Sequence, residues 1–203
     1  KSGTSPPVPV GIEEYIYEGF YTLPSGCTNP IVFSYSNCCR EIGIYNAPGP
    51  NQAFYIQTLF HPVIGNSSHV FLNRPVFVTG KSEPFNLSFA AFDPDGDMLT
   101  FHPKPAMKSK DSTVNYLSGY LPSLTFDSLM TFDTTTGIAT VYPASQQITT
   151  IAGEVREYRN GQLIGKVERD FNVIVVGSYN NPGPLIGGIN GSSSYKLFAH
   201  PGD

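Results

Sequence analysis

The sequence predicts an all-β protein, and three observations support this prediction. Charged residues make up only 14% of the 203 residues, whereas an ordinary soluble domain has about 25%. The chain has 20 Gly and 18 Pro, which mark turns, and its aromatic residues reach 13% without any Trp. No segment places apolar residues at i, i+3, i+4 and i+7 over two turns, the period of an amphipathic helix. Short strands joined by many turns are therefore expected.

Three strands are expected in the first third of the chain. Residues 14–23 alternate between two faces and stop at the turn Pro24-Ser25-Gly26. Residues 31–38 place Ile, Phe and Tyr on one face of a second strand. Residues 47–50 break the pattern, and residues 52–60 again align apolar side chains.

The middle of the chain has more regular spacing. The strands expected there are residues 85–91, 98–102, 130–132, 138–142, 149–158 and 163–176. Asn160-Gly161 separates the last two and supplies the two positive-φ residues of a type I′ turn, whose twist matches the flanking strands. Residues 104–121 have no helical period and are expected to form a loop.

The positions of the turns divide the chain into two sandwich-type modules and a trailing segment. The first, residues 1–66, ends within the turn residues Gly65 to Ser68, and the second spans residues 67–177. Residues 178–203 read as a linker with one strand candidate, residues 195–199. A single strand buries nothing by itself and must add to another sheet, in this chain or in a neighbour.

Composition excludes several partners and compartments. The chain has 12 Lys and Arg against 16 Asp and Glu and a pI near 5.5, so we expect no nucleic-acid partner. Its longest apolar runs, such as residues 171–177, fall far short of the ~20 residues of a membrane-spanning helix, so no membrane insertion is expected. A chain that begins with Lys1 rather than Met reads as a processed or trimmed product.

An acidic loop is the strongest candidate site. Asp93, Asp95 and Asp97 alternate in the sequence DPDGD, where their mutual repulsion would be removed by a bound hard cation. Oxygen ligands favour Ca²⁺ over transition metals. Glu157 shares a strand face with Ile151 and Val155, so an inward-facing carboxylate there would also need a cation. The alternative is an Asp-Gly turn with solvated carboxylates, and a Glu157 that lies at an open margin of the sheet.

Three cysteines, Cys27, Cys38 and Cys39, cannot all pair within the chain. Adjacent residues on a strand point to opposite faces, so we expect one disulfide from Cys27 to one of the pair. The remaining thiol would be free or bonded to a cysteine outside this chain. Clustered cysteines in a chain poor in Lys favour an oxidising, extracytoplasmic setting.

The sequence predicts no enzyme. It contains no G-x-S-x-G, P-loop, G-x-G-x-x-G or H-E-x-x-H motif, and its four histidines are scattered. A pair of glycosidase acids is a tertiary arrangement that sequence spacing leaves open. Three N-x-S sequons make Asn66, Asn86 and Asn190 glycosylation candidates, although ordinary polar loops explain each equally well.

Several segments together resemble a family of large secreted surface proteins of Bacteroidota, those with gliding-motility-associated C-terminal sorting domains. The segments are GIEEYIYEGFYTLPSGCTNPIVFSYSNCCRE, FAAFDPDGDMLTF, FDTTTGIATVYP and EVREYRNGQLIGKVERDFNVIVV, and the resemblance runs from residue 11 to residue 176. The last three are similar to the cadherin-like module of those proteins. Glu41 departs from the family, which has Asn after Cys-Cys-Arg.

The resemblance implies Ig-like or cadherin-like sandwiches in tandem at the bacterial cell surface, exported by the type IX route. Asp93, Asp95, Asp97 and Glu157 match the family's Ca²⁺ loop and its E-Y-R-N-G glutamate. Three Asp-Ser/Thr triplets look like the O-glycosylation signal of that phylum, with Ser112, Ser128 and Thr134 as the candidate residues. Residues 184–203 are similar to the opening of a following module.

The expected function is therefore a non-enzymatic, extracellular structural or adhesive module of a surface protein or filament, stabilised by Ca²⁺. Its partners would be neighbouring modules or copies of itself, through strand addition, and surface glycans. The main alternative is a carbohydrate-binding module of a secreted enzyme, for which the many Tyr would form a stacking platform. A glycosidase fragment is a third possibility.

Overall fold

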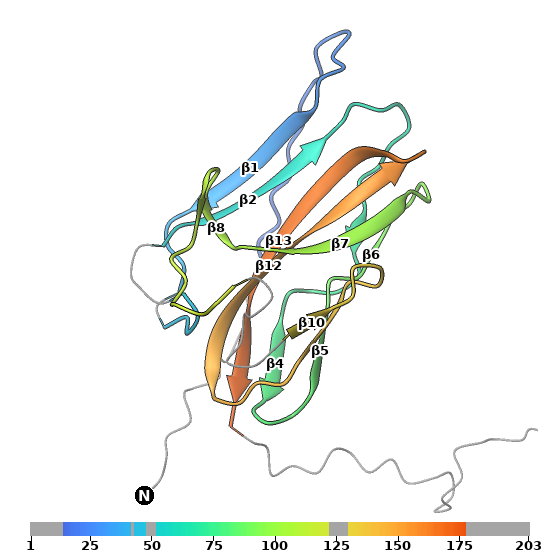
Figure 1. Cartoon of the computed structure of the whole chain (residues 1–203). Coiled ribbons are helices and arrows are strands. Elements are labelled where there is room, and N and C mark those ends of the chain that lie inside the picture. Colours follow the sequence, from blue (N-terminus) through green and yellow to red (C-terminus); the bar gives the residue numbers. More distant parts are fainter. Residues whose placement is uncertain (1–13, 42, 48–51, 122–129, 178–203) are drawn as a thin grey trace, which may run out of the picture.

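The computed structural model describes residues 14–41, 43–47, 52–121 and 130–177, and in these residues the chain is all-β (Figure 1). The strands are β1 (Ile31–Asn37), β2 (Phe54–Phe60), β3 (Val70–Phe71), β4 (Phe77–Gly80), β5 (Phe85–Ser88), β6 (Ala91–Phe92), β7 (Met98–Lys104), β8 (Met107–Ser109), β9 (Ser112–Thr113), β10 (Met130–Phe132), β11 (Ile138–Val141), β12 (Gln147–Arg159) and β13 (Gln162–Val176). None of the described residues forms a helix with the length and apolarity needed to cross a bilayer. The predicted fold class is confirmed.

The long hairpin of β12 and β13 organises the main sheet, whose strand order is β7-β12-β13-β2-β8-β9. β1 adds to β2 at the outer margin, and β4 pairs in parallel with the last residues of β13. The hairpin runs from the upper part of Figure 1, beside β2 and β7, to the lower part, beside β4 and β5. A second sheet, β10-β11-β5, and a two-stranded sheet, β3-β6, complete the described structure.

The turn of this hairpin forms where the sequence predicts it. Asn160 has φ 52° and Gly161 has φ 78°, the left-handed pair that a type I′ turn requires. The two strands then pair from Arg159 opposite Gln162 to Gln147 opposite Val175. One register shift, next to Glu157, interrupts the ladder.

Alternation along the hairpin separates two hydrophobic clusters. The larger cluster lies between the main sheet and the sheet β10-β11-β5, and its fully buried members include Leu87, Phe89, Val141, Val155 and Val173. Ala152, from the opposite face of β12, belongs to a smaller cluster with Ile44, Ala47, Ala106 and Val114. Both faces of β12 are thus covered, and the resulting layers form a sandwich.

Three expectations about elements differ from the structure. Residues 14–23 form no strand, because alternation makes a ladder only where a partner strand supplies hydrogen bonds. Part of the expected loop 104–121 forms β8 and β9, which pair with each other, and β8 also pairs with β2. Residues 195–199, the trailing strand candidate, lie outside the described residues.

The expected module boundary at residue 66 falls between paired strands. β2 precedes it and β13 follows it, yet residues 58–60 of β2 pair with residues 165–167 of β13. Strands from both expected modules therefore share the main sheet. The division into residues 1–66, 67–177 and 178–203 stays a prediction.

Candidate functional site

The acidic loop connects β6 to β7 and folds around the carboxylate of Asp93. Asp93 Oδ1 accepts hydrogen bonds from the backbone N–H of Asp95, at 2.9 Å, and of Asp97, at 3.0 Å. Gly96 has φ +80°, which brings the chain back toward β7. One carboxylate oxygen from each of Asp93, Asp95 and Asp97 lies within 4.8 Å of the others. The three carboxylates that alternate in the sequence therefore converge.

The second oxygen of Asp93 supports a metal site in this loop. Asp93 is only 5% exposed, and its Oδ2 is buried without a hydrogen-bond partner among the described residues. An ionised oxygen in that position is costly unless a cation or a water contacts it. Carboxylate oxygens are the ligands that Ca²⁺ prefers. The residues present therefore fit Ca²⁺, with Asp93, Asp95 and Asp97 as the side chains that would hold it.

Arg159, which the sequence did not single out, neutralises part of the negative charge of the three aspartates. Its guanidinium donates to Asp97 through Nε, at 2.8 Å from Oδ1, and through Nη2, at 2.6 Å from Oδ2. These hydrogen bonds lower the pKa of Asp97 below its usual value. Its Nη2 also lies 3.8 Å from Asp95 Oδ2. The sequence signal for this contact was the position of Arg159 directly before the Asn-Gly turn. The pairing of β12 with β7 brings that position next to the start of β7.

Glu157 is buried but does not join the three aspartates. It is 0% exposed and faces the same side of β12 as Ile151 and Val155. Its Oε1 accepts a hydrogen bond of 2.7 Å from Asn66 Nδ2, and Asn66 Oδ1 in turn accepts one of 2.9 Å from Arg159. Glu157 is therefore connected to the acidic loop through Asn66 and Arg159. The cluster that could hold an ion comprises the three aspartates.

His69 lies against the other oxygen of Glu157. Its Nδ1 is 3.5 Å from Glu157 Oε2, and both side chains are fully buried. Burial lowers the pKa of His69 below its usual value, although the carboxylate of Glu157 acts in the opposite direction. The ring also contacts Phe71 edge to face, with centroids 5.6 Å apart. Nothing in the sequence distinguished His69 from the other histidines.

The expected disulfide from Cys27 is not formed. The structure joins Cys38 to Cys39 and leaves Cys27 as a free thiol. The expectation assumed that the adjacent cysteines lie on a strand and point to opposite faces. They instead follow Asn37, where β1 ends, so strand alternation does not apply to them.

The glycosylation candidates differ in their surroundings. Ser112 on β9 and Thr134 in the connection from β10 to β11 are exposed, and so is Asn86, whose Oδ1 accepts a 2.8 Å hydrogen bond from Thr140. Asn66 is half-buried, and its side-chain nitrogen is the donor to Glu157. A glycan on that nitrogen would have to displace this contact. Ser128 and Asn190 lie outside the described residues.

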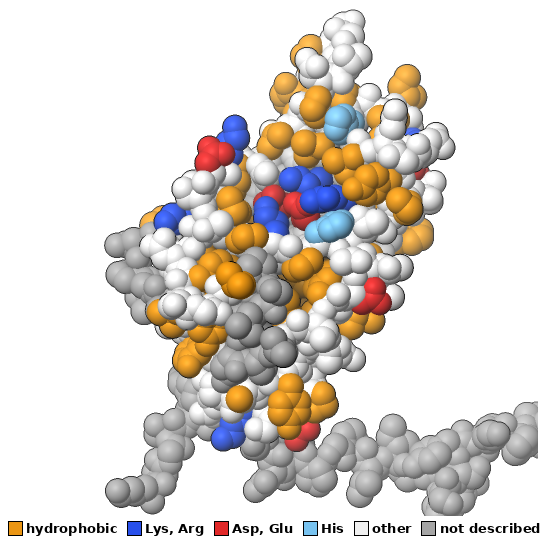
Figure 2. Space-filling model, in the orientation of Figure 1, with side chains coloured by type: hydrophobic (Ala, Val, Ile, Leu, Met, Phe, Trp, Pro, Cys, Tyr) orange, Lys and Arg blue, Asp and Glu red, His pale blue; other side chains and the backbone are white. Residues whose placement is uncertain are grey.

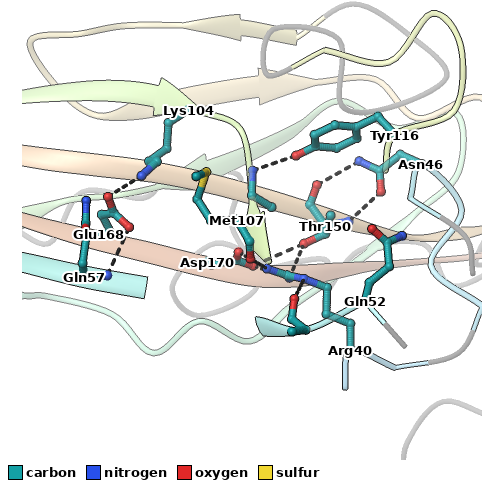
Figure 3. Close-up of polar contacts among 12 residues, drawn as sticks. Arg40, Asn46, Gln52, Gln57, Lys104, Met107, Tyr116, Thr150, Glu168 and Asp170 are labelled. Atoms are coloured by element: carbon teal, nitrogen blue, oxygen red, sulfur yellow. Dashed lines mark hydrogen bonds and ion pairs between the residues drawn. The ribbon is translucent and has the colours of Figure 1, made fainter. Parts of the chain in front are cut away.

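A second polar cluster, centred on Arg40, fastens the chain after β1 to the main sheet (Figure 3). Arg40 donates to both carboxylate oxygens of Asp170, at 2.8 and 2.5 Å, and to the carbonyl oxygen of Met107, at 2.9 Å. The side chains of Arg40 and Asp170 are only 5% and 3% exposed. Thr150 Oγ1 donates to Asp170 at 3.3 Å and accepts from Arg40 at 3.2 Å. The pairing spans 130 residues, and no sequence pattern indicated it.

Ion pairs continue from this cluster along the same face of the main sheet. Glu168 pairs with Lys104 and accepts a 3.1 Å hydrogen bond from the backbone N–H of Gln57 (Figure 3). Glu154 pairs with Arg156 at 2.6 Å and with Lys166 at 3.4 Å; these contacts lower the pKa of Glu154 although burial opposes the shift. Figure 2 shows charged side chains of both signs gathered at the centre of this face. Opposite charges there neutralise one another.

A cavity of about 400 Å³ opens beside Arg40. Its aromatic lining residues are Tyr35, Phe54 and Phe171, and Asn37, Glu41 and Asn172 contribute polar groups. The Tyr35 and Phe54 rings meet edge to face at 6.3 Å. An aromatic wall beside amide and carboxylate groups is the kind of surface that a sugar ring can contact.

Comparison with known proteins identifies no relative of this chain. No protein-family model, no curated protein and no solved structure matches it.

Proposed function

We propose that the chain is a non-enzymatic structural or adhesive module of a bacterial surface protein or filament, located outside the cell and stabilised by Ca²⁺. The observation that carries this proposal is the acidic loop, in which three carboxylates converge and a buried Asp93 oxygen has no partner among the described residues. A cation bound there would tie the turn between β6 and β7 to the sandwich. Such a site contributes stability rather than chemistry.

The surroundings of the loop also favour a structural role. Glu157 and His69, the acid and base groups connected to the loop through Asn66, have fully buried side chains, so a dissolved substrate does not reach them. Asp97 is held by Arg159, at the end of the long hairpin. The loop and the hairpin therefore support each other, and Ca²⁺ would add a third contact at the same place.

Chelation tests the Ca²⁺ part of the proposal. We expect the full chain to melt at a lower temperature after EDTA treatment and to recover when Ca²⁺ is restored. At a Ca²⁺ concentration about 100 times the Kd, the stabilisation is about 2.7 kcal/mol. Asp95→Ala should abolish the difference between the two melting temperatures, because it removes one of the three candidate ligands. Asp95 is exposed, so its loss leaves the core intact.

Asp111→Ala is the matched control, because it removes one exposed carboxylate outside the loop. This variant should respond to EDTA as the unmodified chain does. A melting temperature of the unmodified chain that EDTA leaves unchanged would show that the loop is an ordinary turn held by Arg159. The measurement is differential scanning calorimetry with matched Ca²⁺ and EDTA buffers.

A carbohydrate-binding module is the second candidate function, and the cavity beside Arg40 is the observation that favours it. Binding to a glycan array that is lost in Tyr35→Ala and retained in Tyr142→Ala would support it. Tyr142 is a comparably exposed tyrosine that does not line this cavity. Absence of glycan binding by the unmodified chain would remove this candidate.

A further inference from the structure

β1 is a seven-residue edge strand, and six of its residues are exposed. All seven of its residues pair in regular register with β2, from Ile31 opposite Phe60 to Asn37 opposite Phe54. Among the described residues no strand pairs with its other side, and Figure 1 places it at the outer margin of the sheet. The backbone N–H and C=O groups on that side are a template for an additional strand.

β1 also lacks the features that normally protect an edge. Its sequence, IVFSYSN, contains no charged residue and no Pro, and no bulge interrupts its pairing with β2. By contrast, the edge strand β7 carries Pro103 and Lys104, and the edge strand β9 has only two residues. Soluble proteins commonly use charge, Pro, bulges and short strands to prevent unwanted pairing. Of these three strands, β1 alone lacks all four.

The faces of β1 offer apolar contacts to an added strand. Val32 is 52% exposed on one face, and Phe33 and Tyr35, both 44% exposed, lie on the other. On that second face the Tyr21 ring packs against Phe33 at 5.7 Å, and the Tyr17 ring stacks on Tyr35 at 6.0 Å. A strand with apolar side chains on both of its faces would therefore bury them beside β1.

We propose that a second copy of this chain adds its residues 195–199 as a strand along the free edge of β1. This inference rests on the proposed structural function and names the partner and the surface through which copies would assemble. The segment YKLFA alternates Tyr195, Leu197 and Ala199 with Lys196 and Phe198, so it has apolar side chains for both faces. Main-chain hydrogen bonds would supply the affinity and these side chains the register.

The described end of β13 lies far from β1, at a place suited to contact with a second copy (Figure 1). β2, the partner of β1, pairs with residues 165–167 of β13, whereas β4 pairs with residues 173–176 of β13. The end of β13 therefore lies about 30 Å along the strand from the place where β2 pairs. Figure 1 shows the end of β13 at the lower end of the molecule and β1 in its upper part. A strand donated from beyond β13 to β1 of another copy would make a head-to-tail contact, which repeats into open chains or closed rings.

Two full-length variants test this arrangement. Ser34→Lys with Ser36→Lys places charge on β1 at two exposed positions and disables the acceptor alone. Leu197→Asp with Phe198→Asp puts a charge on each face of the segment and disables the donor alone. Ser112→Lys, at an exposed position of β9, is the matched control for an added surface lysine. Each variant must first be shown to melt at the same temperature as the unmodified chain.

The readout is sedimentation velocity over a wide range of concentration. We expect the unmodified chain and Ser112→Lys to form oligomers that grow with concentration, and each double variant alone to remain a monomer. An equimolar mixture of the two double variants should form a 1:1 dimer and nothing larger, because one intact donor meets one intact acceptor. Amide hydrogen exchange should then slow in β1.

Three outcomes would overturn the proposal. Dimers of the Leu197→Asp/Phe198→Asp variant alone would show that two β1 edges pair with each other. A monomeric unmodified chain whose residues 195–199 are protected from exchange would show that the segment pairs within its own chain. A monomer without that protection would show that the edge accepts no strand from this chain. Because the EDTA experiment uses melting alone, none of these outcomes decides whether the acidic loop binds Ca²⁺.

Discussion

At the scale of single residues, Gly137 is where the fold depends most directly on the absence of a side chain. Its φ is +71°, and a Cβ added there would lie 2.7 Å from the Phe101 ring in the core. Gly161 has a similar φ of +78°, but beyond its chain neighbours no atom lies within 4 Å of the place that a Cβ would take. The two glycines therefore separate the cost of backbone conformation from the cost of a steric clash.

We expect Gly137→Ala to lower the free energy of unfolding by about 2–4 kcal/mol, from the left-handed backbone and the displaced ring together. Gly161→Ala should cost only about 1 kcal/mol, because its backbone conformation is the sole penalty. Urea unfolding of both variants measures the difference. Equal losses would show that the core accommodates a methyl group beside Phe101.

Asp133 gives a prediction about acid stability. Its Oδ1 accepts a 2.8 Å hydrogen bond from the backbone N–H of Thr135, and this contact, with those from Thr136, lowers its pKa below the usual value. A carboxylate with a lowered pKa stabilises the folded state above its unfolded-state pKa, and this contribution is lost as the pH falls through the folded-state pKa.

We therefore expect the melting temperature to fall between about pH 5 and about pH 2, and to fall less in Asp133→Asn. Part of the decrease should remain, because the pKa values of Asp97 and Glu154 are also lowered. Asp111→Asn controls for the loss of one exposed carboxylate. An identical pH profile for Asp133→Asn and the unmodified chain would contradict the assignment.

At the scale of elements, the buried pair of Arg40 and Asp170 holds the segment after β1 against β13. Removing one member leaves the other charge buried, so we expect Asp170→Leu to cost about 3–5 kcal/mol. The double variant Arg40→Met/Asp170→Leu should cost less than the sum of its single variants, because it leaves no unpaired charge. Chemical unfolding of all four proteins completes the cycle.

The exposed pair of Glu14 and Arg74 serves as the control for this cycle. Their side chains are 51% and 78% exposed at a separation of 3.0 Å, so solvent screens the interaction. Arg74→Met should leave the unfolding curve almost unchanged. Additive losses in the Arg40 cycle would mean that the two buried charges do not depend on each other.

At the scale of the whole molecule, the pairing of β2 with β13 predicts cooperative unfolding. The ladder joins strands on both sides of residue 66, and β12 contributes to both hydrophobic clusters. We expect calorimetry to show one transition whose van't Hoff and calorimetric enthalpies agree. Two separated transitions would instead support independent modules divided at residue 66.

Strand positions and the central hairpin could be predicted from sequence because they depend on neighbouring residues. Asn160-Gly161 predicted the turn between β12 and β13, and period-two alternation predicted that Glu157 shares a face with Ile151 and Val155, which the structure shows to be buried. The convergence of Asp93, Asp95 and Asp97 has the same local origin, because one short loop carries all three.

Contacts between distant segments required the tertiary structure. Arg159 reaches Asp97 across 62 residues, and Arg40 reaches Asp170 across 130, because the order of strands in the main sheet brings them together. The same order gives residues 31–37 a partner and leaves residues 14–23 without a ladder, although both segments alternate.

The sequence alone thus determined the all-β class, the strand face that Glu157 shares with Ile151 and Val155, and the grouping of the aspartates, because local backbone preferences and alternation act over a few residues. Only the tertiary structure decided which strands pair, that Arg159 contacts Asp97, and that β1 lies at an edge of the main sheet among the described residues. Hydrogen bonds between strands are made by backbone groups that nearly every residue carries. Their partners are therefore chosen by the packing of the whole chain.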